Sequence, residues 1–159
     1  MTTIDAHGLS VDVPKGWDGA ITKFDGTSAN TEFAGPHNKG LTLPVLHLAN
    51  FALPPRRGDY GNGAVEIMRR GGLLICLLEF DPVEAKSSLF AGKPIPRQLR
   101  QRDFSPDAMQ RTLKGMSGTQ FFGAEAGRAL CLYVVLGSHA RRAVLVPEVN
   151  KVLATLEVA

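Results

Sequence analysis

The amino-acid sequence predicts one α+β domain, residues 1–159, with a mainly antiparallel β-sheet, packed helices and an amphipathic C-terminal helix. Three observations favour this class. Apolar and polar residues alternate near the N-terminus, two long apolar runs have the length of buried strands, and a clear helical period begins only at Leu145. A chain of 159 residues can bury about two thirds of its unfolded surface, so one hydrophobic core is enough.

The N-terminal part is expected to form strands around a long loop. The stretch "LSVDVPKGWDGAITKF" alternates on both sides of Pro14–Gly19, which predicts strands at 9–13 and 20–24 joined as a hairpin. Residues 25–44 are rich in Gly, Thr, Ser, Asn and Pro, which predicts a surface loop. The stretch "PVLHLANFALP" predicts a strand near 45–52, closed by two prolines.

The middle of the chain contains one clear strand and several short elements. Four glycines break "RRGDYGNGAVEIMRRGG", so "AVEIM" is one short element, either strand or helix. The branched apolar run "LLICLLEF" (73–80) predicts a central strand buried on both faces, and "PVEAKSSLF" predicts a short helix after it. Ser105 as N-cap and Pro106 at the first helical position predict a helix over 106–113.

The C-terminal third is expected to hold a hairpin and the best helix. Two strands, 119–124 and 128–136, are predicted to pair antiparallel around Ala126-Gly127. Pro147 cannot donate a helical hydrogen bond, so the regular helix is expected to start there, with "ARRAV" as a separate turn. The apolar stripe of this helix consists of Leu145, Val149, Val152, Leu153 and Leu156.

Composition and motifs exclude several classes of protein. No stretch approaches the roughly 20 apolar residues of a membrane helix, and the first residues do not resemble a secretory signal, so a cytoplasmic protein without membrane contact is expected. Cys76 and Cys131 lie in apolar runs and predict buried, reduced thiols. The four histidines have no spacing typical of metal ligands, so neither a metal nor a cofactor is expected.

The positive charge of the chain is concentrated in its second half. Residues 81–159 carry eleven basic and seven acidic side chains, whereas residues 1–80 carry seven and eight. The tract 93–114 has six basic residues against two acidic ones, and its candidate binding residues are Arg97, Arg100 and Arg102. An acidic protein partner or an anionic ligand would suit this tract. Nucleic acid is disfavoured because the tract lacks interleaved aromatic residues and a long helix.

The stretch "GSHARR" (137–142) is the second candidate site. Ser138 and His139 are neighbours, so on an extended chain their side chains point to opposite faces and cannot act as a nucleophile–base pair there. The pattern favours Ser138 as an N-cap over a ligand contact or a nucleophile. His139, Arg141 and Arg142 remain candidate binding residues at the junction of a strand and a helix.

Two further stretches have a structural and a functional interpretation. Glu79 ends the predicted central strand, and a pair with an arginine such as Arg128 is favoured over a role as general base. The stretch "RRGDYGNG" (56–63) is favoured as a turn over a glycine-rich anion cradle. No catalytic residue is assigned from the sequence.

The two ends of the chain resemble the PsbP-like group. The stretch "LSVDVPKGW" followed by a strand, and the terminal strand–turn–helix ending in "NKVLATLEV", carry the resemblance over some 40 of 159 residues. It implies an α/β/α sandwich and, because most members are non-catalytic binding or assembly factors, a binding role. The stretches "DYGNGAVEIM" and "GRALCLYVVLGSHARRAVLVPEVNKVLATLEV" are similar in style to small actinobacterial proteins, which implies no activity.

Three functional hypotheses follow from these observations. The first is a non-enzymatic binding or assembly module with a basic contact surface formed by 93–114, Arg141 and Arg142. The second is a small enzyme or anion-binding protein with a site near Gly137–Arg142, which requires His139 to meet a distant carboxylate. The third is homo-oligomerisation through an exposed sheet edge or through the apolar stripe of the C-terminal helix.

Overall fold

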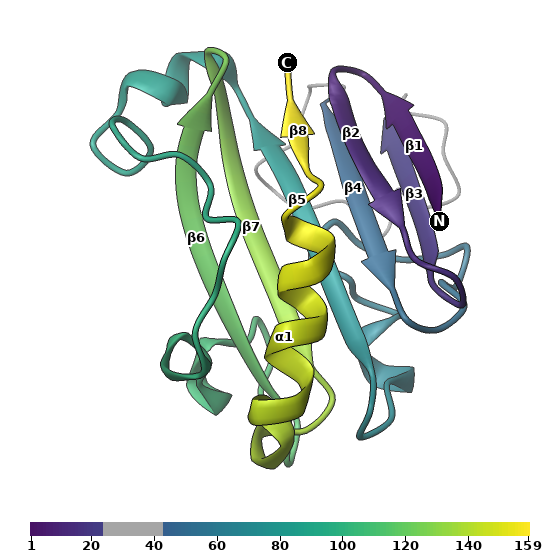
Figure 1. Ribbon diagram of the computed structural model, residues 1–159. Helices are drawn as coiled ribbons and strands as arrows, with labels where there is room; N and C mark the ends of the chain where they lie inside the picture. The colour runs from purple at the N-terminus through teal and green to yellow at the C-terminus, as the bar shows by residue number, and fades with distance from the viewer. Residues whose placement is uncertain (24–42) are drawn as a thin grey trace.

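The computed structural model describes residues 1–23 and 43–159 and contains two antiparallel sheets and one α-helix (Figure 1). The predicted α+β class is confirmed. The smaller sheet has the strand order β1-β2-β8 and the larger one β3-β4-β5-β7-β6. The strands are β1 (Thr2–Ala6), β2 (Leu9–Val13), β3 (Asp18–Lys23), β4 (Pro44–Ala49), β5 (Leu73–Phe80), β6 (Ser117–Glu125), β7 (Arg128–Leu136) and β8 (Glu157–Val158).

The helices of the described residues are one α-helix and several single turns of 3₁₀-helix. The α-helix is α1 (Arg142–Leu153). The 3₁₀ turns include η3 (Val65–Ile67), η4 (Pro82–Lys86), η5 (Gln101–Asp103), η6 (Pro106–Ala108) and η7 (His139–Arg141). No helix in residues 1–23 and 43–159 is long and apolar enough to cross a membrane.

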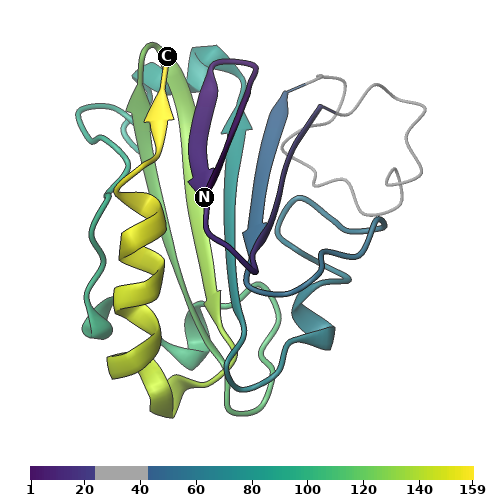
Figure 2. The same ribbon diagram turned by 45° about the vertical axis from the view of Figure 1, so that its right-hand side comes forward.

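The five-stranded sheet has a hydrophobic core on each face. The predicted central strand is confirmed, because β5 lies between β4 and β7 and all but its last residue are buried. Helix α1 and the three-stranded sheet cover one face together (Figures 1 and 2), and apolar residues of both pack there against β4, β5 and β7. Residues from 51–68 and 109–116 cover the opposite face.

The N-terminal hairpin differs from the predicted one. Strand β2 pairs with β1 and β8, whereas β3 pairs with β4, so the predicted pairing of 9–13 with 20–24 is wrong. The turn at Pro14–Trp17, closed by the Trp17 amide donating to the Pro14 carbonyl at 3.0 Å, carries the chain from one sheet to the other. Alternation predicts a strand but not its partner. The predicted loop 25–44 lies almost entirely outside the described residues.

The hairpin of β6 and β7 confirms the prediction for the second half of the chain. Its nine residue pairs run from Ser117–Leu136 to Glu125–Arg128. The turn residues Ala126 and Gly127 have φ angles of 52° and 76°, as a two-residue turn of the primed type requires. The antiparallel pairing of β5 with β7 places the start of β5 beside the end of β7.

Helix α1 begins five residues before the predicted start. It runs from Arg142 with Pro147 inside it, so the expected start at Pro147 is wrong and only η7 forms a separate turn. Proline removes the hydrogen bond to the carbonyl four residues earlier, here that of Ala143, which is exposed and can be solvated. The predicted apolar stripe is confirmed but is buried in the core, so it is not available for homo-oligomerisation.

The element predicted at 106–113 is only the single turn η6. Its expected start is confirmed, because the Asp107 amide donates to the Ser105 hydroxyl at 3.1 Å and Pro106 follows the cap. Tertiary hydrogen bonds then replace helical ones. Backbone bonds of 3.0 Å join Ser105 to Gly118 of β6, and the Gln110 amide donates to the Tyr133 hydroxyl at 2.9 Å.

Candidate functional site

Arg97, the first candidate of the basic tract, is held by partners within the protein. Its guanidinium pairs with both carboxylate oxygens of Glu125, at 2.7 and 2.8 Å, and donates to the carbonyls of Ile95 and Leu156 at 2.7 and 3.1 Å. Hydrogen bonds from Arg97 lower the pKa of Glu125. Arg97 therefore joins the tract to the end of β6 and to the segment after α1.

Arg100 and Arg102 are exposed and lie beside the second half of α1. Asn150 of α1 holds this segment through two hydrogen bonds to the backbone of Leu99, at 2.8 and 3.0 Å. Arg141 and Arg142 lie at the first turn of the same helix. The candidates therefore form two groups. Arg100 and Arg102 lie near Asn150 in the second half of α1, whereas Arg141 and Arg142 lie at its start.

Three segments lie close together in a junction at the start of α1: the turn η7 after β7, the chain around Gly115, and the helix itself. The His139 amide donates to the Gly115 carbonyl at 2.7 Å, and Arg142 Nε donates to the His139 carbonyl at 2.9 Å. Ser138 occupies the N-cap position of η7, but its side chain makes no capping hydrogen bond, so that part of the prediction is wrong. His139 Nδ1 is buried and has no hydrogen-bond partner among the described residues.

Arg69 and Arg70, which the sequence analysis did not select, lie at the same junction. Strand β7 ends and β5 begins at this end of the sheet (Figure 1). The Gly137 amide donates to the Gly72 carbonyl at 2.8 Å, and a Cβ built on Gly137 would lie 1.9 Å from the Arg69 carbonyl oxygen. The sequence contained one signal for this proximity, the two apolar runs 73–80 and 128–136. If these runs pair antiparallel, the residues before the first run lie beside "GSHARR", which follows the second.

We call Arg69, Arg70, Arg141 and Arg142 the basic end of the molecule. A Cβ built on Gly71 would lie 3.6 Å from Arg141 Nη1, so the Arg141 guanidinium lies over the chain next to Arg69 and Arg70. No carboxylate of residues 1–23 and 43–159 forms an ion pair with any of these four arginines. Uncompensated positive charge of this kind attracts anionic groups.

A groove of about 600 Å³ opens beside the basic end. Its lining comes from the chain after β4, from η3 and from the approach to β5, and it is mainly apolar. Ile67 is 56% exposed there, although it is a large apolar residue. The lining residues are Asn50, Phe51, Ala52, Ile67, Arg69, Gly71 and Gly72. The groove therefore combines an apolar surface with an arginine.

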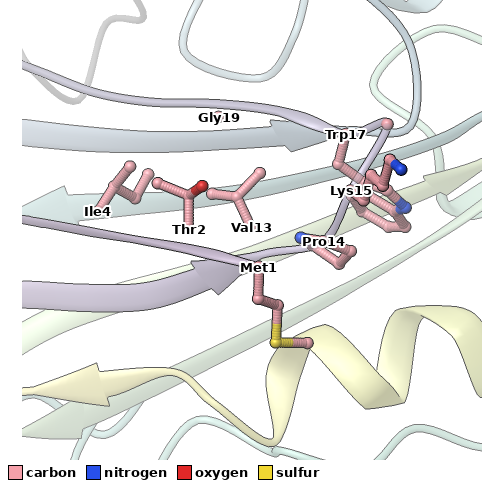
Figure 3. Close-up of a pocket in the computed structure, with 9 residues that line it drawn as sticks. Met1, Thr2, Ile4, Val13, Pro14, Lys15, Trp17 and Gly19 are labelled. Carbon is pink, nitrogen blue, oxygen red and sulfur yellow. The ribbon is translucent and has the colours of Figure 1, made fainter.

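A second groove, of about 370 Å³, lies between the β1–β2 hairpin and β3 (Figure 3). Figure 3 shows Ile4 and Val13 between these strands, with Trp17 and Lys15 at the turn. Lys15 is the one charged side chain among its lining residues. Its lining mixes polar and apolar surface, but it holds no second charged side chain that would orient an ionic ligand.

His47 is a core histidine whose two ring nitrogens both have hydrogen-bond partners. It is 2% exposed on the face of the sheet opposite α1. Arg57 Nε donates to His47 Nδ1 at 2.9 Å, and His47 Nε2 lies 2.9 Å from the Asp59 carbonyl, to which it donates in this tautomer. The imidazole thereby fastens the turn 56–63 to β4, which supports the structural interpretation of that turn.

Replacement of His47 by glutamine is expected to flatten the dependence of stability on pH between about 4 and 6.5. Burial, together with the Arg57 charge, lowers the pKa of His47 from 6.5 to about 4. In the unfolded chain His47 is protonated below about pH 6.5, whereas in the folded chain it is protonated only below about pH 4. The wild type therefore loses about 3 kcal/mol through His47 as the pH falls across this window.

Urea unfolding of wild type and His47→Gln at several pH values between 7.5 and 4 measures this difference. The carboxylates titrate in both proteins, so the difference between the two curves isolates the imidazole. Parallel curves for the two proteins would show that His47 takes up its proton equally in the folded and unfolded states.

The surroundings of Cys76, Cys131 and Glu79 indicate structural roles for these three titratable residues. Cys76 and Cys131 are free and buried, as predicted, and burial raises the pKa of both thiols, that of Cys131 to about 11. The predicted pair of Glu79 with Arg128 is confirmed, with Arg128 Nε donating to Glu79 Oε1 at 3.1 Å. Within the described ranges, no group of three or more His, Cys, Asp or Glu side chains could hold a metal ion.

Comparisons with known proteins add no relative. Neither the family models nor the curated proteins nor the solved structures give a match to this chain. The resemblance of the chain ends to the PsbP-like group stays a prediction. The residues at the basic end and in the groove beside it are therefore the observations that bear on function.

Proposed function

We propose that the protein is a non-enzymatic binding module whose basic end binds an acidic protein partner. The observation that carries this proposal is the approach of the Arg141 guanidinium to Gly71, in the segment that carries Arg69, beside an open, mainly apolar groove. Arginines at such a surface steer an acidic partner and form bidentate pairs with its carboxylates. The implied likeness to binding and assembly factors supports the same role by analogy only.

The basic tract 93–114 has a smaller part in this proposal than the sequence alone suggested. Arg97 is engaged by Glu125, whereas Arg100 and Arg102 stay exposed beside α1. Arg100 and Arg102 can widen the positive field, but neither residue lines the groove. The two pairs of exposed arginines therefore provide matched variants for a test.

The variant Arg69→Glu/Arg141→Glu is expected to lose an acidic partner that the wild type captures, whereas Arg100→Glu/Arg102→Glu retains it. Both variants change the net charge by the same amount, so a general loss of electrostatic attraction affects them equally. Affinity capture from extracts of the source cell, at low and high salt, followed by mass spectrometry measures the difference. Circular dichroism and thermal unfolding check that both variants fold.

Two results would contradict the proposal. Loss of the partner only in Arg100→Glu/Arg102→Glu would place the contact surface on the tract 93–114. Equal capture by the wild type and both variants, without dependence on salt, would remove charge as the basis of binding, because exposed ion pairs weaken as salt screens them.

A second candidate function is the binding of a small free anion near Gly137–Arg142. The buried, unpartnered Nδ1 atom of His139 favours it, because such atoms usually have a partner. No described carboxylate is bonded to the His139 ring, so an acid–base role lacks its second group. Calorimetric titration with inorganic phosphate tests this candidate, and saturable binding that His139→Ala abolishes would support it.

A further inference from the structure

We infer that the groove beside the basic end takes up one apolar side chain of an acidic peptide segment, whose carboxylates pair with Arg69 and Arg141. This inference rests on the proposed function and adds the chemical class of the segment that docks. Three features of the described residues carry it: the apolar wall, the occupied backbone of the floor and the two arginines.

The wall of the groove is mainly apolar. Ile67 projects from η3 with 56% of its surface exposed, and Phe51 and Ala52 face it from the chain after β4. The floor consists of Gly71 and Gly72, which have no side chains to fill the space. Covering such a surface with an apolar side chain removes apolar area from water, which is favourable.

Hydrogen bonds within the protein hold the floor and leave few free backbone groups to which a peptide could pair as an added strand. Asn50 accepts from the Leu73 amide at 2.8 Å and donates to the Gly71 carbonyl at 2.9 Å. The Gly72 carbonyl accepts from the Gly137 amide, and the Gly72 amide donates to the Arg69 carbonyl, each at 2.8 Å. A ligand is therefore recognised by side chains, and the floor does not need to rearrange before it binds.

The charge of the rim determines the sign of the ligand. Arg69 lines the groove, and the Arg141 guanidinium lies over Gly71 of its floor. Asp18 lies beside the chain after β4, where the Leu53 amide donates to its carboxylate at 2.8 Å. Neither Arg69 nor Arg141 forms an ion pair with it. The planar guanidinium matches a carboxylate bidentately, so acidic residues beside an apolar anchor fit both parts of the site.

The acidic peptide satisfies more of the site than the other occupants do. A small inorganic anion would pair with the arginines but leave Ile67 and Phe51 in water. An uncharged apolar ligand would cover the wall but leave two unpaired arginines at the rim. The second groove has a single charged side chain, Lys15, in place of two arginines.

The probe for the test is the labelled peptide acetyl-Glu-Asp-Leu-Phe-Glu-Asp-amide, followed by fluorescence anisotropy. Two control peptides carry Ser-Ser in place of Leu-Phe, or Gln and Asn in place of the acidic residues. We expect the probe to bind more tightly than either control. In ¹⁵N-labelled protein, the amide signals of Gly71 and Gly72 are expected to move on binding.

Paired substitutions separate the two parts of the site. Ile67→Ser and Arg69→Gln are each expected to weaken binding of the probe on the order of tenfold. The matched controls Val83→Ser, at a residue 72% exposed on η4, and Arg100→Gln are expected to leave it unchanged. All four side chains are accessible to solvent, so these variants are expected to fold.

Three results would overturn the inference. If the Ser-Ser peptide binds as tightly as the probe and Ile67→Ser has no effect, the groove takes no anchor and the basic end alone binds. If inorganic phosphate displaces the probe and moves the same glycine signals equally, the site belongs to a small anion. If no peptide binds, the inference fails; the proposed function fails with it only when Arg69→Glu/Arg141→Glu also leaves partner capture intact.

Discussion

Replacing Arg128 by methionine is expected to lower the free energy of unfolding by about 3 kcal/mol. The Glu79 side chain is 7% exposed and that of Arg128 14%, and two guanidinium nitrogens donate to the same carboxylate oxygen. Removal of the arginine leaves a buried carboxylate without its cation, which costs more than the intact pair contributes. Chemical denaturation at neutral pH measures the loss.

The double variant Glu79→Met/Arg128→Met tests the reason for this effect. It removes both charges, so a large part of the lost stability is expected to return. Lys151→Met serves as a control, because its pair with Glu148 is exposed and is worth less than about 1 kcal/mol. A double variant no more stable than Arg128→Met would mean that the arginine stabilises the fold by packing rather than by charge.

Replacing Gly137 by alanine is expected to destabilise the protein by about 3 kcal/mol, although only one methyl group is added. The new Cβ would lie 1.9 Å from the Arg69 carbonyl oxygen and 3.0 Å from the Gly72 amide nitrogen. Both are backbone atoms, so no side-chain rotation can relieve the contact. The start of β5 or the end of β7 must move, and with it the segment that lines the groove.

Gly71→Ala is the matched control for Gly137→Ala. Its Cβ would meet only Arg141 Nη1, at 3.6 Å, which is an ordinary contact. We expect a change within about 0.5 kcal/mol. Thermal and chemical unfolding of both variants give the comparison. Equal stability of the two would show that the junction of β5 and β7 is looser than the close approach at Gly137 indicates.

Elements defined by nearby residues could be predicted from the sequence. The run 73–80 is the buried central strand, the stripe beginning at Leu145 is the buried face of α1, and Ser105 caps a helical turn. Each of these depends on residues a few positions apart. The start of α1 differs from the prediction because solvent can satisfy the Ala143 carbonyl, which Pro147 leaves without its helical donor.

The candidate site could be predicted only in part. The strand-to-helix corner at "GSHARR" lies where expected, with Arg141 and Arg142 at the start of α1. The partners Arg69 and Arg70 lie some seventy residues earlier in the chain and reach the corner only through the pairing of β5 with β7. The sequence does not distinguish Arg97 from Arg100 and Arg102 as a candidate, but in the structure Glu125 binds the Arg97 guanidinium.

Four features of the fold follow from the sequence alone: the α+β class, the buried strand at 73–80, the hairpin of β6 and β7, and the apolar stripe of α1. Periodicity and turn residues act over a few positions, and the chain carries these signals directly. Other features appear only in the folded chain: β2 pairs with β1 and β8, Arg97 pairs with Glu125, and Arg141 approaches Gly71 beside the groove. Those contacts join distant segments, and the burial of the whole core selects them over the local alternatives.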